Sequence, residues 1–264
     1  MLDNLRKLPR YRGLIQSLVA RELKARYRGS VLGFFWSFIN PLLLLLVYTF
    51  VFAYVMPPAQ LNEIPNVALF LFCGLLPWTW FQTSLVESSN ILISGGNLIK
   101  KVMFPAEILP IVTVLANLMH FLLGLPILVA FLIYFDAPLQ ISELVWFPVV
   151  VFVQLMLSIA LALILSALTV HFRDIKDILA NVMTLWFFAT PIIYYWKFAP
   201  EKIRRYLDLN PFTHLAISYQ EILYFPGDFG HWKWLVALGI GCLPLFLFAY
   251  FLFDRLRDSF AEEV

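Results

Sequence analysis

The chain has 264 residues, of which 61% are hydrophobic and 14% are charged, and its formal net charge is +2. This composition excludes a soluble globular domain, and the small net charge argues against nucleic acid as a partner. We therefore expect an integral membrane protein in which the order of basic and apolar segments sets the topology.

A basic amphipathic segment comes first in the chain. Over residues 11–28, apolar side chains such as Leu14 and Leu18 recur at helical spacing while cations fall on the other side. This pattern predicts a helix lying in the membrane plane, with its apolar face among acyl chains. Glu22 can pair with Arg26 four residues on. The cations expected to contact lipid phosphates at the inner leaflet are Arg21, Lys24, Arg26 and Arg28. The alternative, a solvated basic tail, is disfavoured by the regular spacing.

Six apolar stretches follow that are long enough to cross a bilayer, which takes about 20 residues per helix. They are roughly Val31–Met56, Asn66–Val86, Ile108–Phe135, Leu144–Val170, Ile178–Trp196 and Trp234–Phe253. The sequence thus predicts an all-α integral membrane protein with one six-helix transmembrane domain over residues 31–256. Residues 1–30 are expected to form the cytoplasmic interface helix and tail, and residues 257–264 a cytoplasmic C-terminal tail.

Basic residues are distributed unevenly between the two sides of the predicted spans. With both termini in the cytoplasm, fourteen of the 19 Lys and Arg residues lie on the inner side. The five others all fall in the connection from Lys197 to Lys233, between the fifth and sixth spans. Because cytoplasmic segments carry an excess of Lys and Arg, we expect the N- and C-termini inside.

The connection between the fifth and sixth spans contains a short amphipathic helix of its own. It is predicted over Thr213–Phe225, where Leu215, Tyr219, Ile222 and Leu223 share a face. Thirteen residues are too few to span. The sequence leaves two interpretations open at this point, a re-entrant hairpin at the outer surface and a folded external loop.

No motif for nucleotide binding or hydrolysis is present. The sequence has no G-x-x-x-x-G-K-[ST] phosphate loop, no G-x-S-x-G and no H-E-x-x-H, so we expect a transport subunit and not an enzyme. The acidic residues lie at the ends of the apolar runs, which disfavours a carrier driven by an ion gradient. Uphill transport would then take its energy from another subunit.

A few isolated side chains could still carry chemistry. His120, inside the third apolar run, is either a ligand or proton carrier, or a histidine that a neighbouring helix satisfies. The second interpretation is favoured because no second ligand is near in sequence, and we predict no metal site. Cys73 and Cys242 are expected to be packing residues. His171 with Asp174 is a poor candidate for a catalytic pair.

Six blocks of the chain, taken in order, resemble the permeases of type-2 ABC exporters. The blocks are Arg26–Pro41, Gly74–Trp78, Asn97–Pro110, His171–Ile178, Thr190–Tyr194 and Leu209–Phe212. The similarity covers nearly the whole chain in the right order, and the likeness is greatest to the Wzm-type permeases that export O-antigen in lipopolysaccharide biosynthesis. The resemblance implies a multi-pass protein of the bacterial inner membrane.

The resemblance also implies the partners. Two copies of the chain would form a homodimer, with two copies of a Wzt-type ATP-binding subunit beneath it. ATP and Mg²⁺ would be held by that partner, so this chain is expected to bind no cofactor. An undecaprenyl-type lipid-linked polysaccharide would leave through the channel between the two permease copies. Membrane lipids would surround the permease.

Two cytoplasmic connections resemble the contacts that couple such permeases to the ATPase. The first is Ser88–Phe104 and the second follows the fourth span. The implied coupling residues are Asn97, Lys100, Lys101, Phe104, Arg173, Asp174 and Lys176. The alternative for each connection is a solvated or lipid-facing charge cluster.

Aromatic residues are the candidates for contact with a sliding sugar polymer, because sugar C–H faces stack on aromatic rings in any register. The candidates are Tyr48, Tyr54, Trp78, Trp80, Phe81, Trp186, Tyr194, Tyr195 and Trp196. For any one of them, packing or anchoring at the membrane interface is the favoured alternative.

Other functions remain open from the sequence. A type-2 ABC permease for teichoic acid, capsule, a lipid or a drug would share the helix count and the need for an ATPase. A passive channel or a membrane-embedded lipid-modifying enzyme would need no ATP-binding partner.

Overall fold

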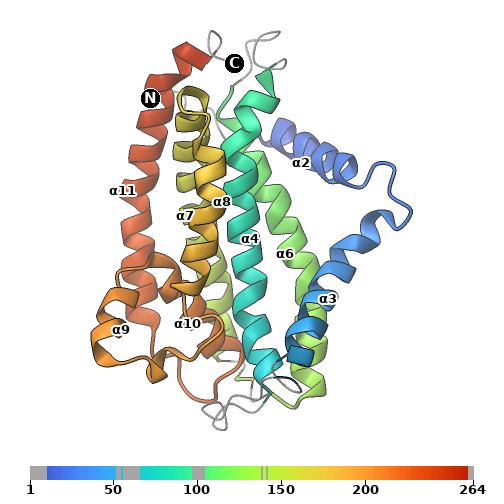
Figure 1. Ribbon diagram of the computed structural model, residues 1–264, viewed down its shortest axis with the longest axis vertical. Helices are drawn as coiled ribbons and strands as arrows, with labels where there is room; N and C mark the ends of the chain where they lie inside the picture. Colours follow the sequence, from blue (N-terminus) through green and yellow to red (C-terminus); the bar gives the residue numbers. More distant parts are fainter. Residues whose placement is uncertain are drawn as a thin grey trace.

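The computed structural model describes residues 11–51, 55, 66–96, 105–137, 139–140 and 142–260. Within these ranges every regular element is helical, and the long helices run side by side (Figure 1). The predicted all-helical membrane class is confirmed. An all-helical fold suits so apolar a chain because helices satisfy their backbone hydrogen bonds internally.

Four helices in the described part of the chain are long and apolar enough to cross a membrane. They are α4 (Val67–Ser94), α6 (Ile108–Tyr134), α7 (Trp146–His171) and α11 (Trp232–Leu256). α4 packs against both α6 and α7, and α7 packs against α11. α4 is the most enclosed of the four, so the centre of the bundle lies around it.

Two further predicted spans are present as shorter helices. α3 (Trp36–Phe50) has 15 residues and α8 (Ile175–Phe188) has 14. Such helices are about 22 Å long, against a hydrocarbon thickness of about 30 Å. The end of the predicted first span, at residues 52–54 and 56, lies outside the described residues. The described helices therefore confirm four of the six predicted spans by length and composition.

The predicted amphipathic helix is α2 (Arg12–Arg26), which lies at one end of the bundle beside α6 (Figure 1). Its apolar face contacts protein, whereas the sequence predicted contact with acyl chains. Leu18 is buried against Ile108 and Val112 at the start of α6, with Leu14 alongside. The prediction missed this because periodicity shows which face is apolar but not what covers it.

Helices α9 (Glu201–Leu207) and α10 (Pro211–Leu223) lie at the end of the bundle opposite α2 (Figure 1). The predicted helix at Thr213–Phe225 is thus present but begins two residues earlier. Asn210 caps it, because its Oδ1 accepts a hydrogen bond from the Phe212 amide at 3.0 Å, and Pro211 suits the first turn. α10 is buried along nearly its whole length and contacts α4, α7 and α11.

Four short 3₁₀ turns complete the described elements. They are η2 (Gly33–Phe35), η5 (Glu143–Val145), η6 (Trp196–Phe198) and η7 (Arg257–Ser259). Directly after η7, Phe260 is fully buried against Phe253 and His171. The described part of the C-terminal segment therefore packs onto the ends of α7 and α11.

Candidate functional site

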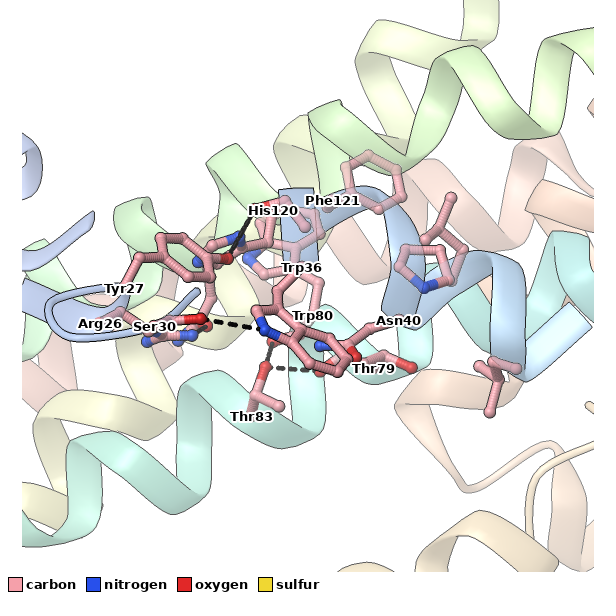
Figure 2. Close-up of a pocket in the computed structure, with 15 residues that line it drawn as sticks. Arg26, Tyr27, Ser30, Trp36, Asn40, Thr79, Trp80, Thr83, His120 and Phe121 are labelled. Carbon is pink, nitrogen blue, oxygen red and sulfur yellow. Dashed lines mark hydrogen bonds between the residues drawn. The ribbon is translucent and has the colours of Figure 1, made fainter. Parts of the chain in front are cut away.

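A cavity of about 530 Å³ lies where the end of α2, the loop after it, α3, α4 and α6 meet. Figure 2 shows Trp36 and Asn40 of α3 across from Thr79 and Thr83 of α4, with Arg26 and Tyr27 at one end. The cavity combines polar groups from four helices with aromatic walls, which is typical of a small-molecule site.

An ion pair joins α2 to the bundle beside this cavity. Arg26 Nη2 lies 2.7 Å from Glu87 Oε2 of α4, and Arg26 Nη1 donates to Asn117 Oδ1 of α6 at 3.0 Å. Asn117 Nδ2 also donates to Glu87 Oε2, at 2.7 Å. The structure thus pairs Arg26 with Glu87 and not with Glu22, and the Arg26 charge is largely neutralised within the protein.

A hydrogen-bonded group around His120 forms the next part of the wall. Tyr27 Oη lies 2.6 Å from Ser37 Oγ, and both oxygens lie 3.2 Å from His120 Nδ1. A neighbouring helix and loop therefore satisfy Nδ1 of His120, as the favoured interpretation predicted. His120 Nε2 is buried and has no hydrogen-bond partner among the described residues. No group of three metal-ligating side chains is found in the described ranges.

The α4 wall of the cavity presents hydroxyl oxygens. Thr79 Oγ1 donates to the Leu75 carbonyl at 2.8 Å, and Thr83 Oγ1 donates to the Thr79 carbonyl at 2.6 Å. Each hydroxyl proton is thus used within the helix, which leaves oxygen lone pairs to accept hydrogen bonds from another molecule.

The other predicted lipid-contacting cations have a different environment from Arg26. Arg21, Lys24 and Arg28 are exposed, and in the described part of the chain none of them forms an ion pair with a carboxylate. The structure therefore divides the four predicted residues into three exposed cations without a carboxylate partner among the described residues and one, Arg26, that is paired with Glu87.

The predicted coupling residues are described only in part. Asn97, Lys100, Lys101 and Phe104 lie outside the described residues. The remaining three, Arg173, Asp174 and Lys176, are exposed at the turn between α7 and α8. This turn lies at the same end of the bundle as α2 and η7 (Figure 1). His171 contacts Ser259 Oγ through Nε2 at 3.3 Å, so it bridges to η7.

The candidate sugar-stacking aromatics fall into two groups. Trp78, Trp80 and Phe81 are at most 2% exposed, and the Trp78 and Phe81 rings lie 4.9 and 4.7 Å from Phe212. Trp186 is half-buried in the same cluster and donates to Asn210 Oδ1 at 2.7 Å. The half-buried candidates outside this cluster are Tyr48, Tyr194, Tyr195 and Trp196. Tyr54 lies outside the described residues.

A histidine pair at the opposite end of the bundle was not predicted. His214 Nδ1 of α10 lies 2.9 Å from His231 Nε2, and the His214 ring stacks on Trp234 at 4.8 Å. Glu221 accepts a hydrogen bond from the His231 amide at 3.0 Å. Burial lowers the pKa of both imidazoles, that of His231 to about 4. Seventeen residues separate the two histidines, and no local spacing rule brings them together.

Sequence reasoning also missed most of the cavity. It considered His120 only as an isolated side chain, and it treated Glu87 only as one of the acidic residues at the ends of the apolar runs. Asn40, in an otherwise apolar stretch, was the signal that could have indicated a polar wall on α3.

Comparison with known proteins agrees with this architecture. The family described as ABC-2 type transporter matches residues 13–224. The chain is 43% identical to the O-antigen export system permease protein RfbA of Myxococcus xanthus over the full length of both proteins. It is 32% identical to a protein of the same name from Klebsiella pneumoniae, over 94% of each chain. The polysialic acid transport protein KpsM of Escherichia coli is 24% identical over 76% of this chain and 78% of its own.

The family match and the full-length relatives confirm the resemblance read from the sequence blocks. They agree with a multi-pass membrane protein acting in transport. The chain belongs to the ABC-2 type transporter family.

Proposed function

We propose that this chain is the permease subunit of an ATP-driven exporter that moves lipid-linked O-antigen-type polysaccharide across the bacterial inner membrane. The observation that carries the proposal is the similarity, over the full length of the chain, to a protein named an O-antigen export permease. The chain has no phosphate-loop motif, so the ATP is hydrolysed by a separate Wzt-type subunit, two copies of which bind a permease homodimer.

In the membrane, the protein has six spans, with α3 and α8 as the first and the fifth and both termini in the cytoplasm. α9 and α10 form a re-entrant hairpin at the outer surface. The burial of α10 among α4, α7 and α11 supports the hairpin, because an isolated external loop would be exposed on several sides. The grouping of α2 and the basic turn between α7 and α8 at one end of the bundle supports the orientation.

Export begins at the inner leaflet, where the pyrophosphate of the lipid-linked substrate meets Arg21, Lys24 and Arg28. Their exposure and the absence of carboxylate partners within the described residues support this role. Arg26 is not part of the phosphate contact, because its guanidinium group is already paired with the carboxylate of Glu87.

ATP binding closes the partner subunits, and the motion reaches the spans through residues 88–104 and through the turn that carries Arg173, Asp174 and Lys176. The exposure of this charged turn at the α2 end supports a docking role. The polymer then advances along the dimer axis. For contact with it we retain the aromatic rings that stay partly exposed in one subunit, Tyr194, Tyr195 and Trp196 at the outer end.

The test is transport in sealed proteoliposomes that contain this chain and its ATP-binding partner. A lipid-linked polysaccharide is supplied on one face of the membrane. Transport is measured as ATP-dependent binding of a lectin to the polysaccharide on the other face. The control is a partner subunit whose phosphate-loop lysine is replaced. We expect transport with the intact partner and none with the control. A stable, ATP-hydrolysing complex that moves a phospholipid or a drug but no polysaccharide would contradict the proposed cargo.

A further inference from the structure

The cavity beside Arg26 contains hydrogen-bonding capacity that the protein itself does not use. Asn40 is exposed in the apolar helix α3, and its amide makes no hydrogen bond to any described residue. The oxygens of Thr79 and Thr83 keep free lone pairs on the opposite wall, because their protons are donated within α4. If these residues served only to pack α3 against α4, the unused amide of Asn40 and the lone pairs of Thr79 and Thr83 would not stabilise that packing.

One aromatic ring of the cavity is held in a defined position. Trp36 Nε1 donates to Ser30 Oγ at 3.1 Å, and the ring remains half-buried on the cavity wall (Figure 2). Trp80 and Phe121, by contrast, are 2% exposed and stack on each other at 5.1 Å. Trp36 is therefore more accessible to a ligand than Trp80 or Phe121, and the cavity lining around it includes hydroxyl and amide groups.

Charge determines which kind of ligand suits the cavity. The charged residue in its lining is Arg26, and Glu87 balances it at 2.7 Å. A neutral group rich in hydroxyls therefore fits better than an anion. Lys24 of α2 and Arg28, two residues after its end, lie outside the lining, form no ion pair with a described carboxylate, and remain for a phosphate.

The cavity extends in the direction of proposed export. Glu87 and Thr79 are separated by eight residues of α4, about 12 Å along the helix axis. The cavity thus leads from the level of Arg26 toward the end of the bundle where α9 and α10 lie. A substrate whose phosphate stays with the cations of α2 would direct the group attached to that phosphate into the cavity.

We infer that this cavity binds a neutral sugar ring at the phosphate end of the lipid-linked substrate, stacked on Trp36 and hydrogen-bonded by Asn40, Thr79 and Thr83. The inference rests on the proposed function and assigns a sugar-recognition site to each single subunit. The cavity volume, about 530 Å³, lies within the range of about 300 to 1,000 Å³ that is typical of small-molecule sites.

The test measures equilibrium binding to the complex with the ATP-binding partner in nanodiscs, without ATP. Two probes are compared, a short polyprenyl pyrophosphate carrying one hexose and the same polyprenyl pyrophosphate without sugar. We expect the wild-type complex to bind the sugar-bearing probe at least tenfold more tightly. The double variant Asn40→Leu/Thr79→Val and the single variant Trp36→Leu should bind both probes equally.

Thr49→Val is the matched control. Thr49 also donates its hydroxyl proton within α3, to the Leu45 carbonyl at 2.7 Å, but it lies outside the cavity lining. This variant should keep the preference for the sugar-bearing probe. Assembly with the partner subunit, checked by gel filtration, shows that each variant is folded.

Equal affinity of the wild-type complex for the two probes would overturn the inference, as would a preference that survives in both cavity variants. Polysaccharide transport by a wild-type complex that does not distinguish the probes would overturn this inference and leave the proposed function intact. A sugar preference that needs Asn40 and Thr79, in a complex that transports no polysaccharide, would support the cavity assignment and contradict the proposed export.

Discussion

Arg26, the last residue of α2, lies 2.7 Å from the carboxylate of Glu87, which is about five and a half turns into α4. The same carboxylate oxygen accepts a hydrogen bond from Asn117 of α6. One acidic side chain therefore fixes the end of the surface helix to two helices of the bundle. This ion pair gives Arg26 a different environment from Arg21, Lys24 and Arg28, the exposed cations that are its neighbours in the sequence.

Replacing Glu87 by Gln should weaken the attachment of α2. The pair is partly exposed, so we expect a loss of about 1–2 kcal/mol, between the values for exposed and buried ion pairs. Thermal unfolding and the rate of proteolysis in the loop after α2, both measured in nanodiscs, report the change. Glu22→Gln on α2 is the matched control and should have little effect. Equal effects of the two variants would show that the pair does not hold α2.

Neutralising the exposed cations should weaken substrate binding. Each cation near an anionic surface contributes about 1 kcal/mol, so Arg21→Gln/Lys24→Gln/Arg28→Gln should bind polyprenyl pyrophosphate roughly 100-fold more weakly at low salt. Direct binding to the complex measures this. The control is Lys202→Gln/Arg205→Gln/Lys233→Gln, which removes three exposed charges at the opposite end. If both triple variants lose affinity equally, the effect is one of overall charge.

The histidine pair should make stability depend on pH. In the folded protein burial lowers the pKa of His214 and His231, whereas unfolded histidines titrate near their ordinary value of about 6.5. Between about pH 6.5 and pH 4 the unfolded chain binds more protons, so the stability of the fold should decrease as pH falls through this window.

Thermal unfolding of the complex in nanodiscs between pH 8 and pH 4.5 tests this dependence. His231→Gln should flatten the decrease, because one depressed imidazole is removed. His171→Gln, at the other end of the bundle, is the control and should keep the wild-type slope. An unchanged slope in His231→Gln would exclude the pair as its source.

Trp78 and Tyr194 should respond differently to truncation. Trp78 is 2% exposed and its ring contacts those of Phe81, Phe187 and Phe212, so Trp78→Ala should cost about 3–5 kcal/mol of folding stability. Tyr194→Ala removes a half-buried ring and should change stability little while slowing export. Unfolding and transport measured on the same preparations distinguish packing from polymer contact. A Trp78→Ala protein of wild-type stability would contradict the packing role.

The sequence predicted those features that depend on local pattern. Run length identified the four long helices, and periodicity identified α2 and α10 to within two residues at their starts. It could not identify partners that lie far apart in the chain. Glu22 was the local choice for Arg26, yet Glu87, 61 residues away, holds it. The sequence predicted that the apolar face of α2 contacts lipid. An apolar face can be covered equally well by acyl chains or by the apolar side chains of α6, and the sequence pattern is the same in both cases.

The same limit applies to the candidate site. Cationic segments and charged turns can be recognised from charge alone, and the structure exposes Arg21, Lys24, Arg173 and Lys176, whose proposed contacts stay predictions. The cavity depends on the meeting of four helices, and its residues, such as Asn40 and Thr79, are ordinary in their own segments. Asn40 and Thr79 become candidate site residues only because both line the same cavity in the folded protein.

The packing of Leu18 on Ile108 and Val112 has a mechanical consequence. These two residues lie in the first two turns of α6, which begins four residues after the end of residues 88–104, the segment that the proposed mechanism assigns to the contact with the ATP-binding subunit. A displacement of that segment would turn α6 at its base and carry α2 with it as a lever. In the proposed mechanism, the exposed cations Arg21 and Lys24 of α2 would then move with each ATP cycle, which would couple substrate binding to ATP-driven motion.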